Sequence, residues 1–228
     1  MTWEFILLFI GAYLLGSIQF ATIFTNRKGV DLRSSGSGNP GASNVLASTK
    51  DVKMAALVFL LDTLKGVVPV LVTKFLGFDI AIQLWVALFA VIGHDFPIFF
   101  GFKGGRGIAT SMGGILAANI WSGLTLLFIV FAVFTPIFKN QPLGVFIAFL
   151  SIPLLPLVFG YAGDGFAVYL PIMFIALLGL SRRLFVKRRL ISQNTPFGEL
   201  FINRLLFDRD IKDRDSWIND TKSEVKTA

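Results

Sequence analysis

The 228-residue chain has no cysteine, a single histidine and few charged side chains. Without cysteine it can form neither a disulfide nor a thiolate metal site. A lone histidine, His94, argues against a histidine-built metal centre, so we expect no metal. Charged residues make up 15% and hydrophobic residues 54% of the sequence, whereas soluble domains carry roughly 25% charged residues. This balance predicts an all-α, polytopic membrane protein without a separate soluble domain before residue 182.

The formal net charge is +7, and the basic residues are unevenly placed. Lys and Arg outnumber Asp and Glu by 10 to 7 in residues 1–181 and by 11 to 7 in residues 182–228. Basic clusters beside apolar runs fit the negatively charged cytoplasmic face of a membrane better than nucleic acid. We therefore expect membrane lipid, and no nucleic acid, as a partner. The same pattern divides the chain into a membrane-embedded domain over residues 1–186 and a charged cytoplasmic tail over residues 187–228.

Several apolar stretches reach the length of about 20 residues that a membrane span needs. The first begins at Trp3, lacks a basic start and is too long for a signal-peptide core, so we interpret it as a span that is retained. The stretch at 108–138 is too long for one ordinary pass and is interrupted near Asn119. The candidate spans are about 3–24, 54–77, 79–101, 108–138, 143–162 and 165–181.

The positive-inside rule indicates how often residues 108–138 cross the membrane. With the N-terminus outside, two crossings put the basic cluster at 182–189 inside, whereas one crossing puts it outside. The sequence therefore predicts a seven-helix transmembrane bundle, with a short or tilted fourth helix at about 107–119. Its N-terminus lies outside and its C-terminus is cytoplasmic. Three polar regions then meet on the inner side, namely 25–53, 102–110 and the segment from 182.

The polar run DLRSSGSGNPGASN at residues 31–44 lies between two hydrophobic runs. Its glycines allow conformations that other residues resist, and successive backbone N–H groups in such a turn can bind an anion. Arg33 adds a planar donor fork suited to phosphate. A flexible, solvated loop is the alternative interpretation. The candidate ligand groups are Arg33, Ser37, Gly38, Asn39, Gly41, Ser43 and Asn44.

A second glycine turn, KGGRG at residues 103–107, leads into an apolar stretch from Ile108. A glycine turn at a helix N-terminus presents free N–H groups to an anion, and Lys103 and Arg106 add full positive charge. The P-loop spacing is absent, so no nucleotide hydrolysis is predicted. The alternative is a sharp turn with basic anchors at the membrane surface. The candidate residues are Lys103, Gly104, Gly105, Arg106 and Gly107.

Two further sites have open interpretations. Asp62 and Lys65 lie within an apolar span at i and i+3, so they share a helix face. They form either an internal ion pair or a group in which Lys65 reaches the polar site. His94 is either a satisfied buried histidine or a hydrogen-bonding member of the site. Two anion-binding turns on one side of a membrane predict a phosphorylated amphiphile as substrate.

These motifs resemble the bacterial acyl-phosphate:glycerol-3-phosphate acyltransferases, the PlsY family. The resemblance rests on the 31–44 loop, the Leu-Asp-x-x-Lys-Gly element at 61–66 and the segment GHDFPIFFGFKGGRGIAT at 93–110. It covers about residues 9–115, with matching motif order and spacing. It implies a seven-helix bundle that transfers a fatty acyl group from acyl phosphate to the 1-hydroxyl of sn-glycerol 3-phosphate. The products would be lysophosphatidate and phosphate, formed without a cofactor in the inner (plasma) membrane, with the site on the cytoplasmic side and the protein as a monomer.

The resemblance also implies roles for individual residues. Ser37, Asn39 and Arg106 would be catalytic, with Ser37 binding the substrate and not acting as a nucleophile. Direct attack on the acyl carbon is expected, because no Cys and no Ser–His–Asp order is present, and the leaving phosphate would serve as the base. The substrate-binding residues would be Arg33, Gly38, Gly41, Ala42, Ser43, Asn44, Lys65, His94, Lys103, Gly104, Gly105 and Gly107.

The chain departs from the family pattern at several positions. The family more often has Thr at Ser43, Lys at Arg106 and Pro at Gln19. Its third motif, His-Arg-x-Asn-Ile-x-Arg-Leu-Leu-x-Gly-x-Glu, is missing after the last span. Either Asn203 supplies the missing Asn after a short insertion, or residues 190–228 are an amphipathic charged tail, which the charge pattern favours.

Two other functions stay open from the sequence. One is a transporter of a phosphorylated anion, in which the substrate path crosses the whole bundle. The other is a non-catalytic or altered-acceptor relative of the acyltransferases, suggested by the missing third motif.

Overall fold

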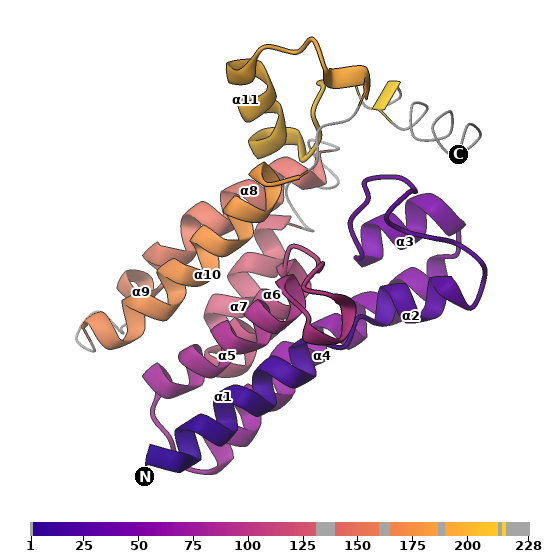
Figure 1. Ribbon diagram of the computed structural model, residues 1–228. Coiled ribbons are helices and arrows are strands. Elements are labelled where there is room, and N and C mark those ends of the chain that lie inside the picture. The colour runs from indigo at the N-terminus through magenta and orange to yellow at the C-terminus, as the bar shows by residue number, and fades with distance from the viewer. Residues whose placement is uncertain (1, 131–139, 160–164, 187–189, 214–215, 218–228) are drawn as a thin grey trace.

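The computed structural model describes residues 2–130, 140–159, 165–186, 190–213 and 216–217, and every regular element in them is helical (Figure 1). The α-helices are α1 (Thr2–Gly16), α2 (Phe20–Asn26), α3 (Ala42–Thr49), α4 (Val52–Phe75), α5 (Ile80–Asp95), α6 (Ile108–Ala118), α7 (Ile120–Leu127), α8 (Gln141–Ser151), α9 (Leu155–Val158), α10 (Phe166–Leu184) and α11 (Phe197–Phe207). The all-helical prediction is therefore confirmed.

Five helical segments in the described residues are long and apolar enough to cross a bilayer. Each has at least 18 residues, close to the length that spans a hydrocarbon core of about 30 Å. The predicted count of seven crossings and the orientation of the termini stay predictions. The five segments are Trp3–Asn26, Val52–Phe75, Ile80–Phe100, Gln141–Val158 and Phe166–Leu184.

The predicted interruption near Asn119 is confirmed. The α6 helix ends there and α7 begins at the next residue, with the Asn119 side chain accepting a hydrogen bond from Ser122 N at 2.8 Å. At 1.5 Å per residue, α6 is about 16 Å long, roughly half of the hydrocarbon thickness. The remainder of the predicted fifth crossing, residues 131–139, lies outside the described residues.

The centre of the bundle is α5, which packs against α1, α4, α6 and α10. Its small core residues include Ala87 and Ala90, which are fully buried. The α4 and α6 helices pack especially closely, because a Cβ atom at Gly66 would lie only 2.1 Å from the carbonyl oxygen of Thr110. Thr110 Oγ1 also donates a hydrogen bond to the Asp62 carbonyl at 2.9 Å. This contact fixes the direction in which α6 leaves the 103–107 turn.

Polar segments gather at one end of the bundle. The first span is interrupted between α1 and α2, where the Gln19 side chain donates to the carbonyl oxygen of Lys103 at 2.8 Å. The loop that follows α2 leads to α3, which packs against α4. In Figure 1, α3 and α11 lie near the end of the molecule away from the N-terminus. The two glycine turns thus lie close enough to form one site.

Residues 197–210 are part of this end of the protein. The α11 helix packs against α8 and α10, and the Arg204 guanidinium pairs with Asp210 at 2.7 Å. The Asp210 carboxylate also accepts a hydrogen bond from Ser192 at 2.7 Å and is 2% exposed. The sequence favoured a charged tail over residues 190–228. The structure differs over residues 197–210, which pack against α8 and α10 and are held by the buried ion pair between Arg204 and Asp210. The domain boundary at residue 186 stays a prediction.

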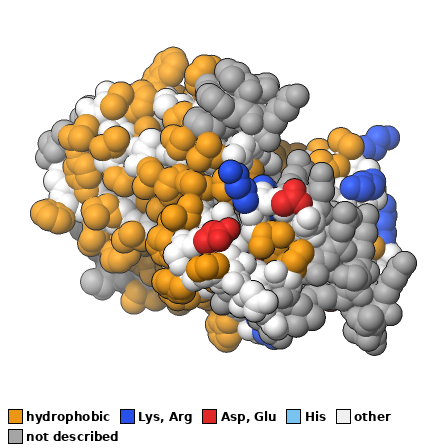
Figure 2. Space-filling view, turned by 90° about the horizontal axis from the view of Figure 1, so that it is seen from above, with side chains coloured by type: hydrophobic (Ala, Val, Ile, Leu, Met, Phe, Trp, Pro, Cys, Tyr) orange, Lys and Arg blue, Asp and Glu red, His pale blue; other side chains and the backbone are white. Residues whose placement is uncertain are grey.

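The outer surface carries many exposed apolar side chains, such as Trp3, Phe75 and Phe166. Figure 2 shows one face, on which hydrophobic side chains cover a broad area beside a small group of charged ones. A broad apolar surface is expected where lipid tails replace water as the solvent. The charged group marks the end where the polar segments meet.

We expect Gly66→Ala to destabilise the α4–α6 contact by about 1–3 kcal/mol, because the added methyl group meets backbone that cannot move aside cheaply. Gly11→Ala is the matched control, because a Cβ atom at Gly11 in α1 has no heavy atom within 4 Å. Thermal unfolding of the purified proteins in detergent measures both. Equal melting temperatures for the two variants would contradict the close packing.

Candidate functional site

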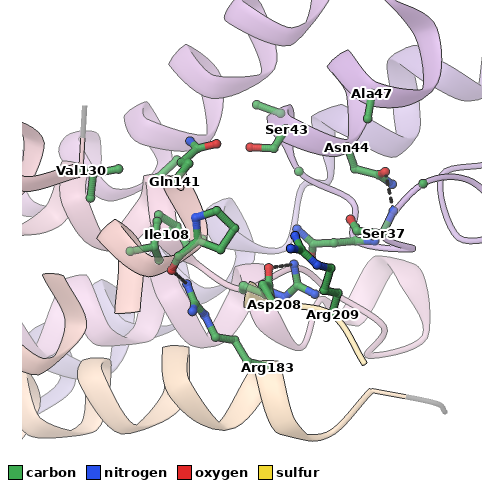
Figure 3. A pocket seen from close by; sticks show the side chains of 18 of the residues that line it. Ser37, Ser43, Asn44, Ala47, Ile108, Val130, Gln141, Arg183, Asp208 and Arg209 are labelled. Atoms are coloured by element: carbon green, nitrogen blue, oxygen red, sulfur yellow. Dashed lines mark hydrogen bonds and ion pairs between the residues drawn. The ribbon is translucent and has the colours of Figure 1, made fainter. Parts of the chain in front are cut away.

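A cavity of about 680 Å³ lies at the polar end of the bundle (Figure 3). This volume falls within the range of about 300–1,000 Å³ typical of small-molecule sites. Both predicted glycine turns contribute to its wall, together with the starts of α3, α6 and α8 and the residues after α11. The polar lining residues are Ser37, Asn39, Ser43, Asn44, Asp62, His94, Arg106, Asn140, Gln141, Arg183, Asp208 and Arg209.

The first wall is the N-terminus of α3. Gly41 is the N-cap residue, and as a glycine it has no side chain to cap the first amides of this helix. Gly41, Ala42 and Ser43 line the cavity. Open amides at a helix start carry partial positive charge. This end of α3 is therefore suited to an anionic group.

Asn44 holds the preceding loop in shape. Its side chain is buried, and its Nδ2 atom donates to the carbonyls of Leu32 and Ser35, each at 3.0 Å. Its Oδ1 atom accepts from Ser37 N at 2.9 Å, as the dashed line in Figure 3 shows. Both amide hydrogens are thus bonded to the loop. Asn44 thus supports the loop that carries Ser37, and since it also lines the cavity, its predicted role in substrate binding stays a prediction.

The second wall is the N-terminus of α6. Gly107 is its N-cap with a φ of 63°, a left-handed conformation that favours glycine. Gly107 likewise has no side chain that could cap the first amides of this helix. Arg106, Gly107 and Ile108 line the cavity. The cavity therefore lies between the starts of α3 and α6, with the Arg106 guanidinium beside the start of α6.

Three side chains from distant segments hold the carbonyl groups of the second turn. Gln19 and Arg33 both donate to the carbonyl oxygen of Lys103. Arg182 donates to the carbonyl oxygens of Gly104 and Gly105, at 3.0 and 3.1 Å. These bonds fix the position of the turn's carbonyls. Arg33 holds the turn through one of its donors, and its role as a phosphate ligand stays a prediction.

Burial lowers the pKa of the Arg33 guanidinium, Asp31 opposes this effect, and Arg182 adds to it. The two arginines are thus close enough to repel each other across the turn. Because each of them bonds to turn carbonyls, that repulsion is offset by hydrogen bonds. The sequence showed Arg182 only as a basic residue beside a span.

Asp62, Lys65 and His94 form a buried cluster behind the turns. Lys65 Nζ lies 2.7 Å from Asp62 Oδ1, and the Lys65 side chain is 1% exposed. His94 Nδ1 lies 3.8 Å from the same carboxylate oxygen. Asp62 and His94 line the cavity, whereas Lys65 does not. The geometry favours the internal ion pair over a Lys65 that reaches the site directly.

The third wall was not anticipated from the sequence. Arg183, at the end of α10, is 1% exposed and lines the cavity. Its guanidinium donates to the carbonyls of Pro142 and Leu205, and so ties α8 to α11. In the sequence, Arg183 belongs to the basic pair at 182–183. The positive-inside rule accounts for that pair as a marker of the inner side, so it did not point to a place in the site.

The fourth wall is the segment after α11. Asp208 forms an ion pair with Arg106, shown by a dashed line in Figure 3, and Arg209 lies beside it. Asn203 is buried, does not line the cavity and donates to the carbonyl oxygen of Asp210 at 3.2 Å. The interpretation in which Asn203 supplies a missing site residue is therefore not supported by its position.

The structure brings most of the predicted site residues to one cavity. Those that line it are Ser37, Asn39, Gly41, Ala42, Ser43, Asn44, His94, Arg106 and Gly107. Those that lie behind the wall or beside it are Arg33, Gly38, Lys65, Lys103, Gly104 and Gly105. Lys103 is exposed, and its backbone carbonyl makes its contacts with the site.

The chain is similar to several known proteins. A family model described as glycerol-3-phosphate acyltransferase matches residues 6–191. Glycerol-3-phosphate acyltransferase 5 of Dehalococcoides mccartyi is 37% identical over 226 residues, which cover 96% of this chain and 94% of that protein. The glycerol-3-phosphate acyltransferase of Thioalkalivibrio sulfidiphilus is 50% identical over 122 residues, covering 53% of this chain and 59% of that protein.

Two crystal structures of PlsY (YgiH), an integral membrane glycerol 3-phosphate acyltransferase, are similar to this fold. The glycerol 3-phosphate form has a TM-score of 0.72 at 37% identity, covering 79% of this chain and 88% of that one. The lysophosphatidic acid form has a TM-score of 0.69 at 36% identity over the same shares. The likeness therefore extends to sequence as well as fold.

We expect Gly105→Ala to weaken ligand binding at the cavity, because a Cβ atom there would lie 2.2 Å from His94 Nε2. The turn or the histidine would have to shift, and either movement displaces Arg106. Gly198→Ala in α11 is the control, since nothing lies within 4 Å of a Cβ atom there. Titration of inorganic phosphate into each purified variant measures the effect, and equal affinities would rule out the close approach.

Proposed function

The chain belongs to the glycerol-3-phosphate acyltransferase family, and on that premise we propose that it acylates the 1-hydroxyl of sn-glycerol 3-phosphate with acyl phosphate as the donor. The observation that carries the proposal is the cavity between the starts of α3 and α6, with Arg106 in its wall. Two helix N-termini and a guanidinium form a strong site for phosphate. Both proposed substrates carry phosphate.

The proposed reaction is a direct acyl transfer. The 1-hydroxyl oxygen of the acceptor attacks the carbonyl carbon of the acyl phosphate and forms the ester bond. The bond between that carbon and the bridging phosphate oxygen breaks, and the oxygen keeps the electron pair. The hydroxyl proton passes to the departing phosphate. Lysophosphatidate and inorganic phosphate are the products, and no covalent acyl-enzyme is formed.

The cavity residues divide this work. Arg106 and the amides at the start of α6 stabilise the charge that develops on the leaving phosphate. The loop from Gly41 to Ser43, at the start of α3, binds the second phosphate. Ser37 and Asn39 hydrogen-bond the reacting groups, since both line the cavity. His94 orients the second turn, together with Asp62 and Lys65 behind it.

The apolar acyl chain of the donor would be accommodated on the lipid-facing side of the protein. The cavity also has apolar lining, including Phe59, Ile108 and Val145, and many side chains on the outside of the bundle are apolar. We place the acyl chain in a groove open to lipid. We further propose seven crossings, an inner (plasma) membrane location and a cytoplasmic site, because the positive-inside rule puts loop 25–53, the 103–107 turn and the segment from 182 on that side.

Arg106→Ala and Ser37→Ala should each lower acyl-phosphate-dependent lysophosphatidate formation, by roughly 100-fold for the lost charge contact. Arg27→Ala is the control, because Arg27 is exposed and is not a cavity-lining residue. The assay follows radiolabelled glycerol 3-phosphate into lipid. Full activity in both cavity variants would refute the assigned site.

We expect phosphate release to match lysophosphatidate formation one for one when purified protein receives acyl phosphate and glycerol 3-phosphate. Acyl coenzyme A in place of acyl phosphate should give no product. Uptake of glycerol 3-phosphate into proteoliposomes without acyl transfer would instead establish a transporter. Binding of both substrates without turnover would identify a non-catalytic relative.

The orientation can be mapped directly, because the chain has no cysteine. We expect Lys28→Cys in the first loop to be labelled by a membrane-impermeant maleimide only after the cells are opened. Leu76→Cys, at the opposite end of α4, should be labelled in intact cells. The reverse pattern would contradict the proposed orientation.

A further inference from the structure

The guanidinium proposed to bind phosphate already has an anionic partner. Asp208 Oδ2 pairs with Arg106 Nη1, and the two side chains are only 15% and 9% exposed. Both residues line the cavity, and Figure 3 shows Asp208 at its edge beside Arg209. The Asp208 carboxylate therefore contacts the same guanidinium, that of Arg106, that the substrate's phosphate would contact.

The position of Asp208 is fixed by the fold. Asp208 ends α11 in a left-handed conformation with a φ of 59°, and its amide donates to the Arg204 carbonyl at 3.1 Å. Arg204 in turn pairs with Asp210 at 2.7 Å and donates to the carbonyl of Leu184 at 2.6 Å. These bonds attach the end of α11 to the end of α10. The Asp208–Arg106 contact is consequently a built part of the structure and not an accidental surface pair.

A phosphate dianion and a carboxylate cannot share Arg106 without cost. Their negative charges would repel each other at close range. Charged groups that are mostly buried also lose more of their hydration than surface groups do. A phosphate ligand that binds Arg106 therefore competes with Asp208 for it.

We propose that Asp208 is an intramolecular competitor of the phosphate ligand and sets the affinity of the site for it. The proposal rests on the proposed function only in assigning Arg106 to phosphate. When a competing contact leaves a binding site free for a fraction of the time, the apparent dissociation constant rises by the inverse of that fraction. If the ion pair is closed for roughly nine-tenths of the time, removing it tightens phosphate binding about 10-fold.

Two variants of Asp208 remove the carboxylate and keep the backbone turn. Asn and Gly both adopt the left-handed conformation readily, so Asp208→Asn and Asp208→Gly preserve the end of α11. Asp213→Asn is the matched control, because it removes the same charge from an exposed position in the same segment. Isothermal titration of full-length protein in detergent, with sn-glycerol 3-phosphate and with inorganic phosphate, gives the dissociation constants.

Both Asp208 variants should bind these ligands about 10-fold more tightly than the wild type, with Asp213→Asn unchanged. In an Arg106→Ala background, Asp208→Asn should give no further gain, which isolates the pairwise interaction. Unchanged or weaker binding in the Asp208 variants would overturn the proposal, since Asp208 would then orient Arg106 for the ligand. Tighter binding in a protein that transfers no acyl group would support the competitor while refuting the proposed activity.

Discussion

The hydrogen bonds that hold the carbonyls of the 103–105 turn organise the site. Gln19, Arg33 and Arg182 come from three separate parts of the chain and bond to that one short stretch of backbone. Buried backbone carbonyls, such as those of Gly104 and Gly105, need such partners because water does not reach them. With its carbonyls held in place, the turn presents Arg106 and the start of α6 to the cavity. Gln19, in the break of the first span, and Arg182, in α10, therefore shape the site by holding this turn.

The close packing of α4 against α6 positions the helix starts that border the cavity. The absence of a side chain at Gly66 lets α4 approach α6, and α4 also carries α3 against its side. The starts of α3 and α6 thereby border the same cavity, where their partial positive charges add. The acidic group of Asp62 lies behind them and is neutralised by Lys65. The result is a polar cavity with two helix N-termini in its wall at one end of an otherwise apolar bundle.

The sequence predicted the parts of this arrangement that have local causes. Apolar runs predicted the helices, Asn119 predicted the break between α6 and α7, and the glycine turns predicted two segments that both contribute to the cavity wall. It did not predict the partners of those turns, since hydrogen bonds such as that from Arg182 to Gly104 depend on tertiary packing. Arg33 and Asn44 have side chains that suit both ligand binding and loop bonding, and only the fold shows their bonds to the turn and the loop. The contact of Asp208 with Arg106 could not be predicted, because its segment has the charge pattern of a solvated tail.

The central claim is that Arg106 and the starts of α3 and α6 together bind the phosphate groups of the substrates. An experimental structure of this protein with sn-glycerol 3-phosphate bound tests it most directly. The account predicts density for the phosphate group inside the cavity, within hydrogen-bond distance of Arg106 or of the amides at Ala42–Ser43 or Gly107–Ile108. A phosphate group held outside this cavity, with Arg106 still paired to Asp208, would contradict it.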